Sequence, residues 1–441
     1  MTGDVHSPPG LPVVGSVHRL ARDPLRYLAG VQNAYGGQYP LVRLDPPGNR
    51  PVTVVTDAEL VHEVLADRDR FRRPNGSDQS QRREGLLSSD GQLWETQRAV
   101  LEPAFVGTQL ADYADIAGRT VDDVLAGWPE EGAVDLYEEM SVITMRVITQ
   151  SLFDQDTTRE RGRRVREALA VVGRETEFGL LDFLVPDMLQ SGPSDDLEEA
   201  NDLLDTVAAD FVERHREQPD PPRNMLTALL EAKQDPEVTL ADNELIDEAV
   251  LFMTAGQETT ALTLTYAFYW LSRHPDAREK LREEATTVLD GDRPGWDDLS
   301  ELTYTERVVR ETLRLTPPAW NIPREVRRPL RLAGTDLDEE ELLLLSPYAH
   351  HRDGRAWNDP QSFRPERWGE SASRAKDSYF PFGSGPRVCI GRQIALTEAQ
   401  FTLAHVLQQY DVETTTADLD FRLGVTMRPA TPLETGVQRV S

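Results

Sequence analysis

Cysteine is nearly absent from this sequence, since its 441 residues include only Cys389. A single thiol excludes a disulfide within the chain and any zinc or iron–sulfur site that needs several of its cysteines. A lone cysteine is most often a small apolar residue of the core. Cys389 lies among three glycines, with an arginine two residues before it, and these neighbours decide whether it has another role.

Lysine is almost as scarce. The chain has 47 basic residues, of which three are lysines, against 76 acidic residues, and its net charge is −29. Nucleic acid is therefore excluded as a partner, because phosphate binding depends on basic patches. The acidity fits either a docking surface or an adaptation of the whole surface to a salty cytoplasm, where ions screen repulsion. Acidic residues are spread from Asp4 to Glu434, so we favour salt adaptation; the composition resembles that of halophilic archaeal proteins.

Signals for export or membrane insertion are also missing. The first six residues contain neither a basic nor an apolar segment, so we expect no signal peptide, no membrane anchor and a cytoplasmic location. The most apolar stretch, Ala249 to Leu271, is as long as a membrane span of about 20 residues. It contains Gln257 and Glu258, which predict instead a buried helix with a polar site at its middle.

No internal repeat, flexible linker or low-complexity tract divides the chain. We therefore expect one domain over residues 1–441, β-richer at about residues 1–70 and helical afterwards. Apolar residues at helical spacing dominate after residue 58, so the expected fold class is mainly α with a small β-sheet. The predicted helices are Ala58 to Ala66, Trp94 to Leu101, Tyr137 to Leu152, Asp196 to Arg216, Thr239 to Ser272, Pro275 to Leu289 and Tyr304 to Leu315. The predicted strands are Pro51 to Thr56, pieces of Leu330 to Leu345, and Leu423 to Met427.

The longest predicted helix, Thr239 to Ser272, would span about 50 Å and must cross the core. Thr239 is expected as its N-cap, with Asp242 three residues on in a variant of the capping box. Gly256 lies near the middle, where it costs about 1 kcal/mol relative to alanine. Such a glycine indicates either close helix packing or a site.

Two charged patterns follow along the chain. Glu311 and Arg314 are three residues apart on one predicted helix, so they share a face and can pair. The proline-rich stretch from His350 to Trp368 is too long for a simple connection. If Arg367 joins Glu311 and Arg314, the three side chains form a buried network that holds this stretch in place.

Four patterns in order carry a family resemblance. They are Ala255-Gly-Gln-Glu-Thr-Thr260, Glu311-Thr-Leu-Arg314, Phe363-Arg-Pro-Glu-Arg367 and Phe382-Gly-Ser-Gly-Pro-Arg-Val-Cys-Ile-Gly391. The last matches Phe-x-x-Gly-x-Arg-x-Cys-x-Gly at every fixed position, and the sequence resembles a cytochrome P450, a haem-thiolate monooxygenase, over nearly its whole length. The resemblance implies the cytochrome P450 fold, with haem b (iron protoporphyrin IX) between the long central helix and the C-terminal cysteine loop.

The resemblance also assigns residues. Cys389 is the expected iron ligand, because a thiolate donates electron density to haem iron. The glycines of the loop let the backbone wrap around the sulfur, Phe382 shields it, and the following helix directs its positive end toward it. Arginines and a tryptophan are expected on the haem propionates. The full expected cofactor-binding set is Trp94, Arg98, Ala255, Arg324, Phe382, Arg387, Cys389 and Gly391.

Glu258 and Thr259 resemble the proton-delivery pair of the family, an acid beside an alcohol, and are the expected catalytic residues. Two rival functions are a peroxygenase, which takes oxygen from hydrogen peroxide, and a haem sensor or carrier without turnover. The acid–alcohol pair favours a monooxygenase over both. His350 and His351 are adjacent, so their side chains point apart and we expect no metal site there.

The implied reaction inserts one oxygen atom from dioxygen into an apolar substrate by hydroxylation or epoxidation. Electrons are expected from a separate ferredoxin and its reductase, docking near Arg98, Arg387 and Arg392 on a monomeric enzyme. Aromatic residues in the expected pocket suggest a fatty acid, terpene or steroid. The expected pocket segments are the loop between residues 72 and 93, Thr176 to Leu189, Phe252 to Gly256, Ala319 to Ile322 and Val425 to Met427.

Overall fold

The computed structural model describes residues 6–9, 17–44, 51–74, 83–107, 109–175, 194–236, 238, 240–369 and 377–440. Helices make up most of it, and the strands are short. The α-helices are α1 (Val17–Arg22), α2 (Pro24–Tyr35), α3 (Ala58–Ala66), α4 (Gly91–Leu101), α5 (Gln109–Leu125), α6 (Leu136–Phe153), α7 (Arg159–Glu175), α9 (Asp195–Glu217), α10 (Met225–Gln234), α11 (Asp242–Arg273), α12 (Pro275–Leu289), α13 (Thr303–Leu315), α14 (Pro347–His350) and α15 (Arg392–Gln409).

The strands form small sheets. They are β1 (Leu41–Leu44), β2 (Val52–Val55), β3 (Phe71–Arg72), β4 (Glu131–Asp135), β5 (Arg324–Val326), β6 (Leu330–Leu332), β7 (Thr335–Leu337), β8 (Leu342–Leu344), β9 (Tyr410–Thr414), β10 (Phe421–Leu423), β11 (Met427–Pro429) and β12 (Glu434–Arg439). The largest sheet has the order β1-β2-β8-β5-β3, in which β2 runs parallel to β8 and the other pairs are antiparallel. The strands β10 and β11 form a hairpin, and β4-β12-β9 form a separate three-stranded sheet. The mainly α fold class with small sheets is therefore confirmed.

Local sequence explains where several helices begin. The carboxylate of Asp57 accepts the backbone N–H of Leu60 at the start of α3, and the amide oxygen of Asn224 does the same for Thr227 in α10. Such N-caps satisfy backbone donors that the first helical turn leaves unpaired. At α11 the cap differs from the prediction. The helix begins at Asp242, its N-cap is Ala241, and Glu244 accepts the Ala241 N–H at 2.6 Å.

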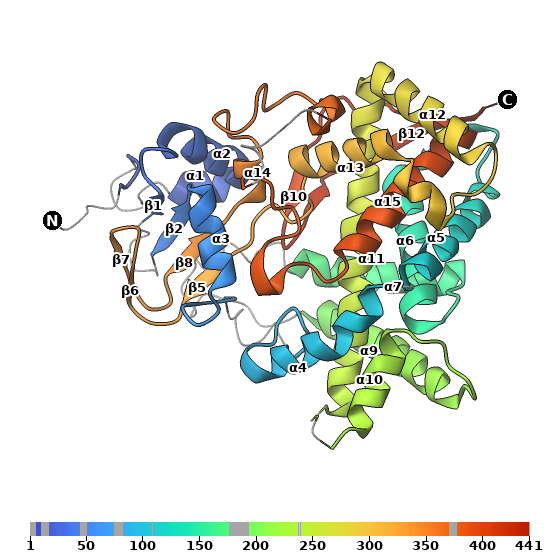
Figure 1. Ribbon diagram of the computed structural model, residues 1–441, viewed down its shortest axis with the longest axis horizontal. Helices are drawn as coiled ribbons and strands as arrows, with labels where there is room; N and C mark the ends of the chain where they lie inside the picture. The colour runs from blue at the N-terminus through green and yellow to red at the C-terminus, as the bar shows by residue number, and fades with distance from the viewer. Residues whose placement is uncertain are drawn as a thin grey trace.

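The predicted N-cap at Thr239 was therefore wrong, because the acid that reaches back to the first turn lies at Glu244. Thr239 itself is outside the described residues. The prediction of a long central helix is confirmed. In Figure 1, α11 crosses the helical part of the molecule, with α6 and α15 beside it and the five-stranded sheet at the N-terminal side.

One predicted strand was wrong. Leu423 to Met427 is the turn of the β10–β11 hairpin and touches the two strands only at its ends. The sequence reads as a strand because Val425 and Met427 alternate with smaller residues, yet the hydrogen bond from Gly424 N to Thr426 O closes the turn. Among the helices in the described ranges, none combines the length and the apolar character needed to cross a membrane.

Candidate active site

The segment around Cys389 is a loop whose shape depends on two glycines. Gly383 has a φ of 72° and Gly385 a φ of 70°, a left-handed conformation that residues with a Cβ rarely adopt. A Cβ on Gly385 would also lie 2.7 Å from the carbonyl oxygen of Leu65 in α3. Glycine thus allows a left-handed turn at both positions and a close approach to α3 at Gly385, while the expected wrapping of the backbone around the sulfur stays a prediction.

The Cys389 thiol lies at the end of this loop, just before α15. Its backbone N–H donates to the carbonyl of Phe382 at 3.0 Å, which closes the loop on itself. Burial raises the pKa of the thiol, while the Gly391 N–H and the positive charges of Arg98 and Arg392 oppose this rise. The backbone and charges around the sulfur therefore favour a thiolate, and an added metal ion would complete that stabilisation.

The Cys389 side chain is also exposed. Exposure and desolvation are compatible, because a side chain on the wall of an internal space has accessible surface while protein surrounds it on the other sides. Apart from its two chain neighbours, no residue lies within 4 Å of the point where a Gly391 side chain would begin. The loop therefore has open space at Gly391, two residues after Cys389.

The middle of α11 has an accessible stripe within an otherwise buried helix. Ala255 is exposed, and Thr254 and Thr259 are partly exposed, whereas most neighbouring residues are buried. Residues four apart lie on one helix face, and the Thr259 hydroxyl donates to the Ala255 carbonyl at 2.8 Å. The predicted alcohol therefore lies on the accessible side of the central helix, next to the predicted cofactor contact Ala255.

Gly256 serves helix packing. A Cβ at this position would lie 2.7 Å from Cδ1 of Ile148 on α6. Of the two interpretations offered by the sequence, close packing has direct support, because glycine lets α6 approach α11 at this level.

Trp94 of α4 lies against the guanidinium groups of two arginines. The guanidinium of Arg68 lies 4.5 Å from the centre of the indole ring, and that of Arg387 lies 4.6 Å from it. Arg387 also donates to the Ser89 carbonyl at 2.9 Å and to Asp90 at 3.0 Å. These contacts bring the predicted residues Trp94 and Arg387 together. One turn on from Trp94, Arg98 donates to the Val388 carbonyl at 2.9 Å and so joins α4 to the cysteine loop.

Three arginines meet here without enough anionic partners. Burial lowers the pKa of Arg324 to about 9 and that of Arg73 to about 10, and both are lowered further by repulsion from Arg387. Arg324 donates a hydrogen bond to the carbonyl of the preceding Pro323 at 2.9 Å, and within the described chain neither Arg324 nor Arg73 forms an ion pair. Desolvated cations normally pair with anions, so this cluster has the chemistry of a carboxylate-binding site.

Sequence reasoning missed Arg73. It follows β3 in a stretch without a motif, and it was included only within the pocket loop between residues 72 and 93. Its neighbour Arg72 pairs with Glu325 at 3.1 Å, which raises the pKa of Arg72. The two adjacent arginines therefore differ because one has an acidic partner and the other faces two cations.

The side chains of Glu258 and Thr259 point in different directions. Its carboxylate is buried and accepts hydrogen bonds from Thr426 at 2.9 Å and from Arg428 of the β10–β11 hairpin. The structure therefore places the predicted acid and alcohol next to each other in sequence but on different sides of α11. The sequence predicted neither of the partners of Glu258.

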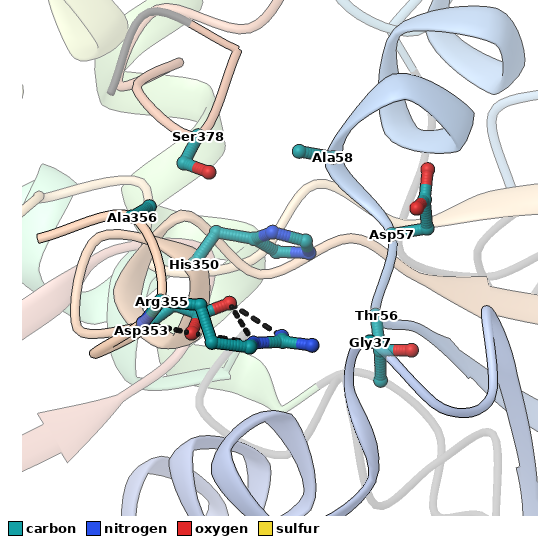
Figure 2. A pocket seen from close by; sticks show the side chains of 9 residues that line it. All are labelled: Gly37, Thr56, Asp57, Ala58, His350, Asp353, Arg355, Ala356 and Ser378. Atoms are coloured by element: carbon teal, nitrogen blue, oxygen red, sulfur yellow. Dashed lines mark hydrogen bonds and ion pairs between the residues drawn. The ribbon is translucent and has the colours of Figure 1, made fainter. Parts of the chain in front are cut away.

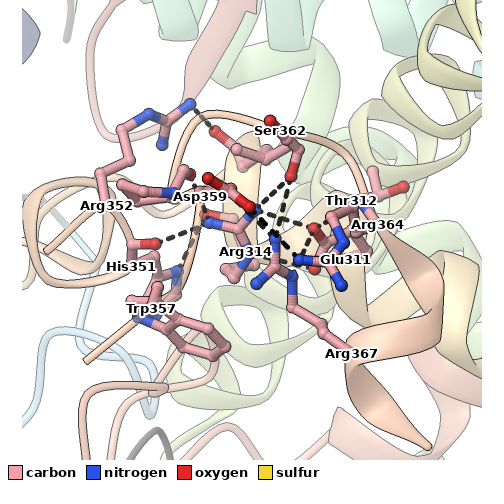
Figure 3. Close-up of polar contacts among 12 residues, drawn as sticks. Glu311, Thr312, Arg314, His351, Arg352, Trp357, Asp359, Ser362, Arg364 and Arg367 are labelled. Atoms are coloured by element: carbon pink, nitrogen blue, oxygen red, sulfur yellow. Dashed lines mark hydrogen bonds and ion pairs between the residues drawn. The ribbon is translucent and has the colours of Figure 1, made fainter. Parts of the chain in front are cut away.

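The charged network around Glu311 is confirmed (Figure 3). Arg314 donates to the two oxygens of Glu311 at 2.8 and 3.0 Å, and Arg367 donates to one of them at 2.9 Å. The remaining donors of both arginines bind backbone carbonyls of the stretch between His351 and Ser362. Two charged side chains of α13 thus hold the long irregular stretch in place, as predicted.

The adjacent histidines form hydrogen bonds with the backbone, although Nδ1 of His350 has no partner in the described chain. His350 donates from Nε2 to the Val55 carbonyl at 2.9 Å, and burial lowers its pKa to about 4. Both ring nitrogens of His351 bind backbone groups, of Arg314 and of Phe380. His350 also lines a cavity of about 200 Å³ with Asp353 and Arg355 (Figure 2). No predicted site residue lines that cavity in the described chain, so it is separate from the region around Cys389 and α11.

Comparison with known proteins identifies the family. The sequence matches the family model of cytochrome P450 over residues 5–433. The chain belongs to the cytochrome P450 family. It is 32% identical over 426 residues to a pentalenene oxygenase of Streptomyces avermitilis, covering 94% of this chain and 92% of the relative. It is 34% identical over 416 residues to a cyclooctatin synthase of Streptomyces melanosporofaciens, covering 91% and 88%. A cyclooctat-9-en-7-ol 5-monooxygenase of the same organism is 29% identical over 411 residues, covering 92% and 88%.

This P450 is a monooxygenase, an oxidoreductase whose cofactor is haem. The residues present fit that cofactor. Cys389, whose thiol has accessible surface, would hold the iron, and Arg73 and Arg324, which form no ion pair in the described chain, would suit the two propionates. Of the expected pocket segments, Thr176 to Leu189 lies outside the described residues. Trp320 is buried, and its indole N–H donates to the Gly424 carbonyl at 2.9 Å.

Proposed function

We propose that this P450 inserts one oxygen atom from dioxygen into an apolar organic substrate, by hydroxylation or epoxidation, with electrons from a separate redox partner. The observation that carries the proposal is the accessible stripe of α11, where the Thr259 hydroxyl lies beside Ala255 in an otherwise buried helix. The names of the relatives, which act on pentalenene and on cyclooctat-9-en-7-ol, support an apolar alkene or alkenol as substrate.

The protein residues have distinct tasks in this proposal. Cys389 binds the iron as a thiolate, and the Gly391 N–H and Arg98 hold its negative charge. Arg73, Arg324 and Arg387 bind the propionates, with Trp94 supporting Arg387 by stacking. When bound, haem supplies the activation of dioxygen and the transfer of one oxygen atom.

Proton delivery falls to the pair on α11. Thr259 donates a hydrogen bond from its hydroxyl on the accessible face of the helix, and Glu258 exchanges protons with solvent. The two side chains leave the helix in different directions, so a proton must travel between them through water or through movement of the carboxylate.

The test begins with the iron ligand. The reduced, carbon-monoxide-bound protein should show the Soret band characteristic of a thiolate, and Cys389→Ser should abolish it. Turnover of pentalenene, cyclooctat-9-en-7-ol, a fatty acid and a steroid is then compared under two conditions. The first contains ferredoxin, its reductase and NAD(P)H, and the second contains hydrogen peroxide alone. Product under the first condition supports the proposal. Product with peroxide alone makes the protein a peroxygenase, and product with neither makes it a sensor or carrier.

We also propose a ferredoxin as the electron donor, docking on the cysteine loop. Arg392 is exposed at the start of α15, Arg387 lies in the loop, and Arg98 donates to the loop's Val388 carbonyl, so these arginines bring positive charge to this face of an acidic protein. Arg392→Gln should slow reduction by ferredoxin and weaken its dependence on ionic strength. Arg328→Gln, at an exposed position outside the loop, is the control, and equal rates in both variants contradict this docking site.

Salt adaptation remains a proposal about the same enzyme. Both the net charge of −29 and the scarcity of lysine support this proposal. In molar salt, ion screening shortens the range of each charge to about 3 Å and so weakens the repulsion between acidic residues. Unfolding temperature and turnover should therefore rise together as potassium chloride increases toward molar concentration. Greatest stability in dilute buffer would exclude this explanation and favour an acidic docking surface.

A further inference from the structure

His62 of α3 binds the stretch of chain that leads into the cysteine loop. Its Nε2 lies 2.8 Å from the carbonyl oxygen of Asp377, and its Nδ1 lies 2.8 Å from the hydroxyl oxygen of Ser384. A carbonyl oxygen can only accept, so Nε2 carries a hydrogen, and in the neutral ring Nδ1 accepts the hydroxyl of Ser384. One half-buried imidazole therefore fixes this stretch at two points.

The residue after Ser384 also lies against α3. A Cβ on Gly385 would lie 2.7 Å from the carbonyl oxygen of Leu65 and 2.9 Å from Cα of Ala66, both at the end of that helix. Backbone thus meets backbone there, about one turn beyond His62. In Figure 1, the chain just before α15 passes beside α3. One side chain and one glycine therefore hold the start of the cysteine loop to this helix.

Phe380 is buried between the two points that His62 holds. Its ring makes edge contacts with the ring of His62, at 6.0 Å between centres, and with that of His350, at 5.4 Å. Its backbone N–H donates to Nε2 of His351 at 3.1 Å, and its carbonyl accepts the Gly383 N–H at 3.0 Å. The ring of His62 therefore packs on the turn that its two hydrogen bonds enclose.

The loop needs support from outside because of its glycines. Both glycines before the cysteine have a left-handed backbone that suits glycine, yet glycine also has the greatest conformational freedom of any residue. The N–H of Cys389 donates to the Phe382 carbonyl at 3.0 Å. The N–H of Val388 donates to the Gly385 carbonyl at 3.1 Å. Ser384 lies between these two acceptors, so a shift of Ser384 would move both of them and disturb the backbone that presents the sulfur.

We propose that His62 is a positioning residue for the cysteine loop, an inference that rests on the role of Cys389 as iron ligand proposed above. The imidazole holds Ser384 against α3, and the hydrogen bonds that follow along the loop then hold Cys389 in one place. A sulfur held in this way loses little conformational freedom when it binds the iron. His62 should therefore slow the loss of haem, although its own hydrogen bonds go to Asp377 and Ser384.

The first experiment separates the hydrogen bonds of His62 from its shape. His62→Phe keeps an aromatic ring against Phe380 but loses both hydrogen bonds, whereas His62→Gln keeps a donor and an acceptor. Transfer of haem from the holoenzyme to an acceptor protein should be about tenfold faster in His62→Phe, an effect of the size that ordinary hydrogen bonds contribute. His62→Gln should restore most of the retention.

His274→Phe is the matched control. His274 lies between α11 and α12, is half-buried like His62, and also combines a hydrogen bond to a carbonyl with a contact to a phenylalanine ring. The carbonyl is that of Trp270, at 2.8 Å, and the ring is that of Phe363, at 5.0 Å between centres. This variant should lose haem no faster than the natural protein.

A second variant reaches the same contact from the loop. Ser384→Ala removes the hydroxyl that Nδ1 of His62 accepts and should also speed the loss of haem. If both variants act through one hydrogen bond, the double variant should be no worse than His62→Phe alone. Hydrogen exchange gives a readout that does not require turnover. In His62→Phe the backbone N–H groups of Val388 and Cys389 should exchange about tenfold faster, while those of β12 keep their natural rates.

The Soret band of the reduced, carbon-monoxide-bound protein completes the test. A smaller share of His62→Phe than of the natural protein should show the thiolate band, and His62→Gln should be close to natural. Unchanged haem transfer and exchange in His62→Phe overturn the positioning role. Equal losses in His62→Phe and His62→Gln, or faster exchange in β12 as well, also overturn it. If the His62 variants are neutral while Cys389→Ser abolishes the band, only the positioning role fails; if Cys389→Ser keeps the band, the proposed iron ligand fails instead.

Discussion

Arg314 donates hydrogen bonds to both carboxylate oxygens of Glu311, three residues earlier on α13, and neither side chain is accessible to solvent. A fully buried ion pair is not in itself stabilising, because both charges were desolvated to form it. Here the arginine also binds three backbone carbonyls of the stretch between His351 and Ser362. The pair therefore orders a loop that contains little secondary structure of its own.

The first prediction concerns this network. Arg314→Gln should destabilise the protein by about 3–5 kcal/mol, because it leaves Glu311 buried with less compensation and frees several carbonyls. Arg310→Gln, on the same helix, breaks a pair with Glu306 in which both side chains are 40% exposed, and should cost less than about 1 kcal/mol. Chemical unfolding of the two variants measures the difference, and similar costs would contradict the role given to Arg314.

The second prediction concerns the arginine cluster. Arg73→Gln should stabilise the apoprotein, since it removes repulsion from Arg324 and Arg387, yet it should weaken haem binding by about 10- to 100-fold through loss of a charge-assisted hydrogen bond. Haem transfer to an acceptor protein and unfolding of the apoprotein measure the two effects. Arg72→Gln is the control, because it removes an ion pair with Glu325 and should destabilise both forms. Equal haem retention in the natural protein and Arg73→Gln would exclude Arg73 from the propionate site.

The third prediction concerns the alcohol on α11. Thr259→Ala should lower product formation by about 10²-fold while NAD(P)H consumption continues, because electrons then reach oxygen without timely protons. Thr259→Ser keeps the hydroxyl that donates to Ala255 and should retain most of the coupling. The test measures the amount of product formed per NAD(P)H consumed. If this ratio in Thr259→Ala equals that of the natural protein, Thr259 does not have the proposed role.

The fourth prediction follows from Glu248, which lies on α11. Burial raises the pKa of its carboxyl to about 8 from an ordinary 4.5, partly opposed by the Leu86 N–H that donates to it at 2.9 Å. Repulsion from the nearby acids Asp247 and Glu244 contributes to this rise. The folded protein therefore holds a proton that the unfolded chain releases, and this stabilisation is present below pH 4.5 and lost as the pH rises toward 8.

The free energy of unfolding should therefore change less with pH in Glu248→Gln than in the natural protein between about pH 4.5 and 8. Each unit of the pKa shift contributes about 1.4 kcal/mol to that difference. Glutamine keeps an oxygen for the Leu86 N–H and cannot ionise, so the fold should persist. Glu59→Gln, at an exposed position of α3, should leave the curve unchanged. A curve for Glu248→Gln as steep as that of the natural protein would show that Glu248 is already ionised.

The sequence predicts contacts well where a motif spaces residues along one element or fixes a turn. Glu311 and Arg314 are of this kind, and the structure confirms their network. The glycines before Cys389 also mark a special backbone, since Gly383 and Gly385 adopt left-handed turns. The central helix was predicted to within three residues at its start. The N-cap of this helix was predicted wrongly. The carboxylate of Glu244, inside the first turn, accepts the backbone N–H of Ala241, and the helix therefore begins after Ala241.

Contacts between distant segments could not be predicted in this way. Arg73 is one arginine among many, and only the fold brings it next to Arg324 and Arg387. Arg428 likewise gives no signal in the sequence, and the turn before it was taken for a strand. Its pairing with Glu258 depends on where the hairpin packs against α11, and no spacing along the chain encodes that position.

The close approach of Gly385 to the Leu65 carbonyl has a consequence for synthesis of the protein. It joins points separated by roughly 320 residues, and contacts at such separation form late because a long loop must be closed first. The parallel pairing of β2 with β8 spans a similar length of chain. The ribosome must therefore release every residue from α3 through the cysteine loop before that loop can settle against α3, so haem capture is expected only after this length of chain has been made.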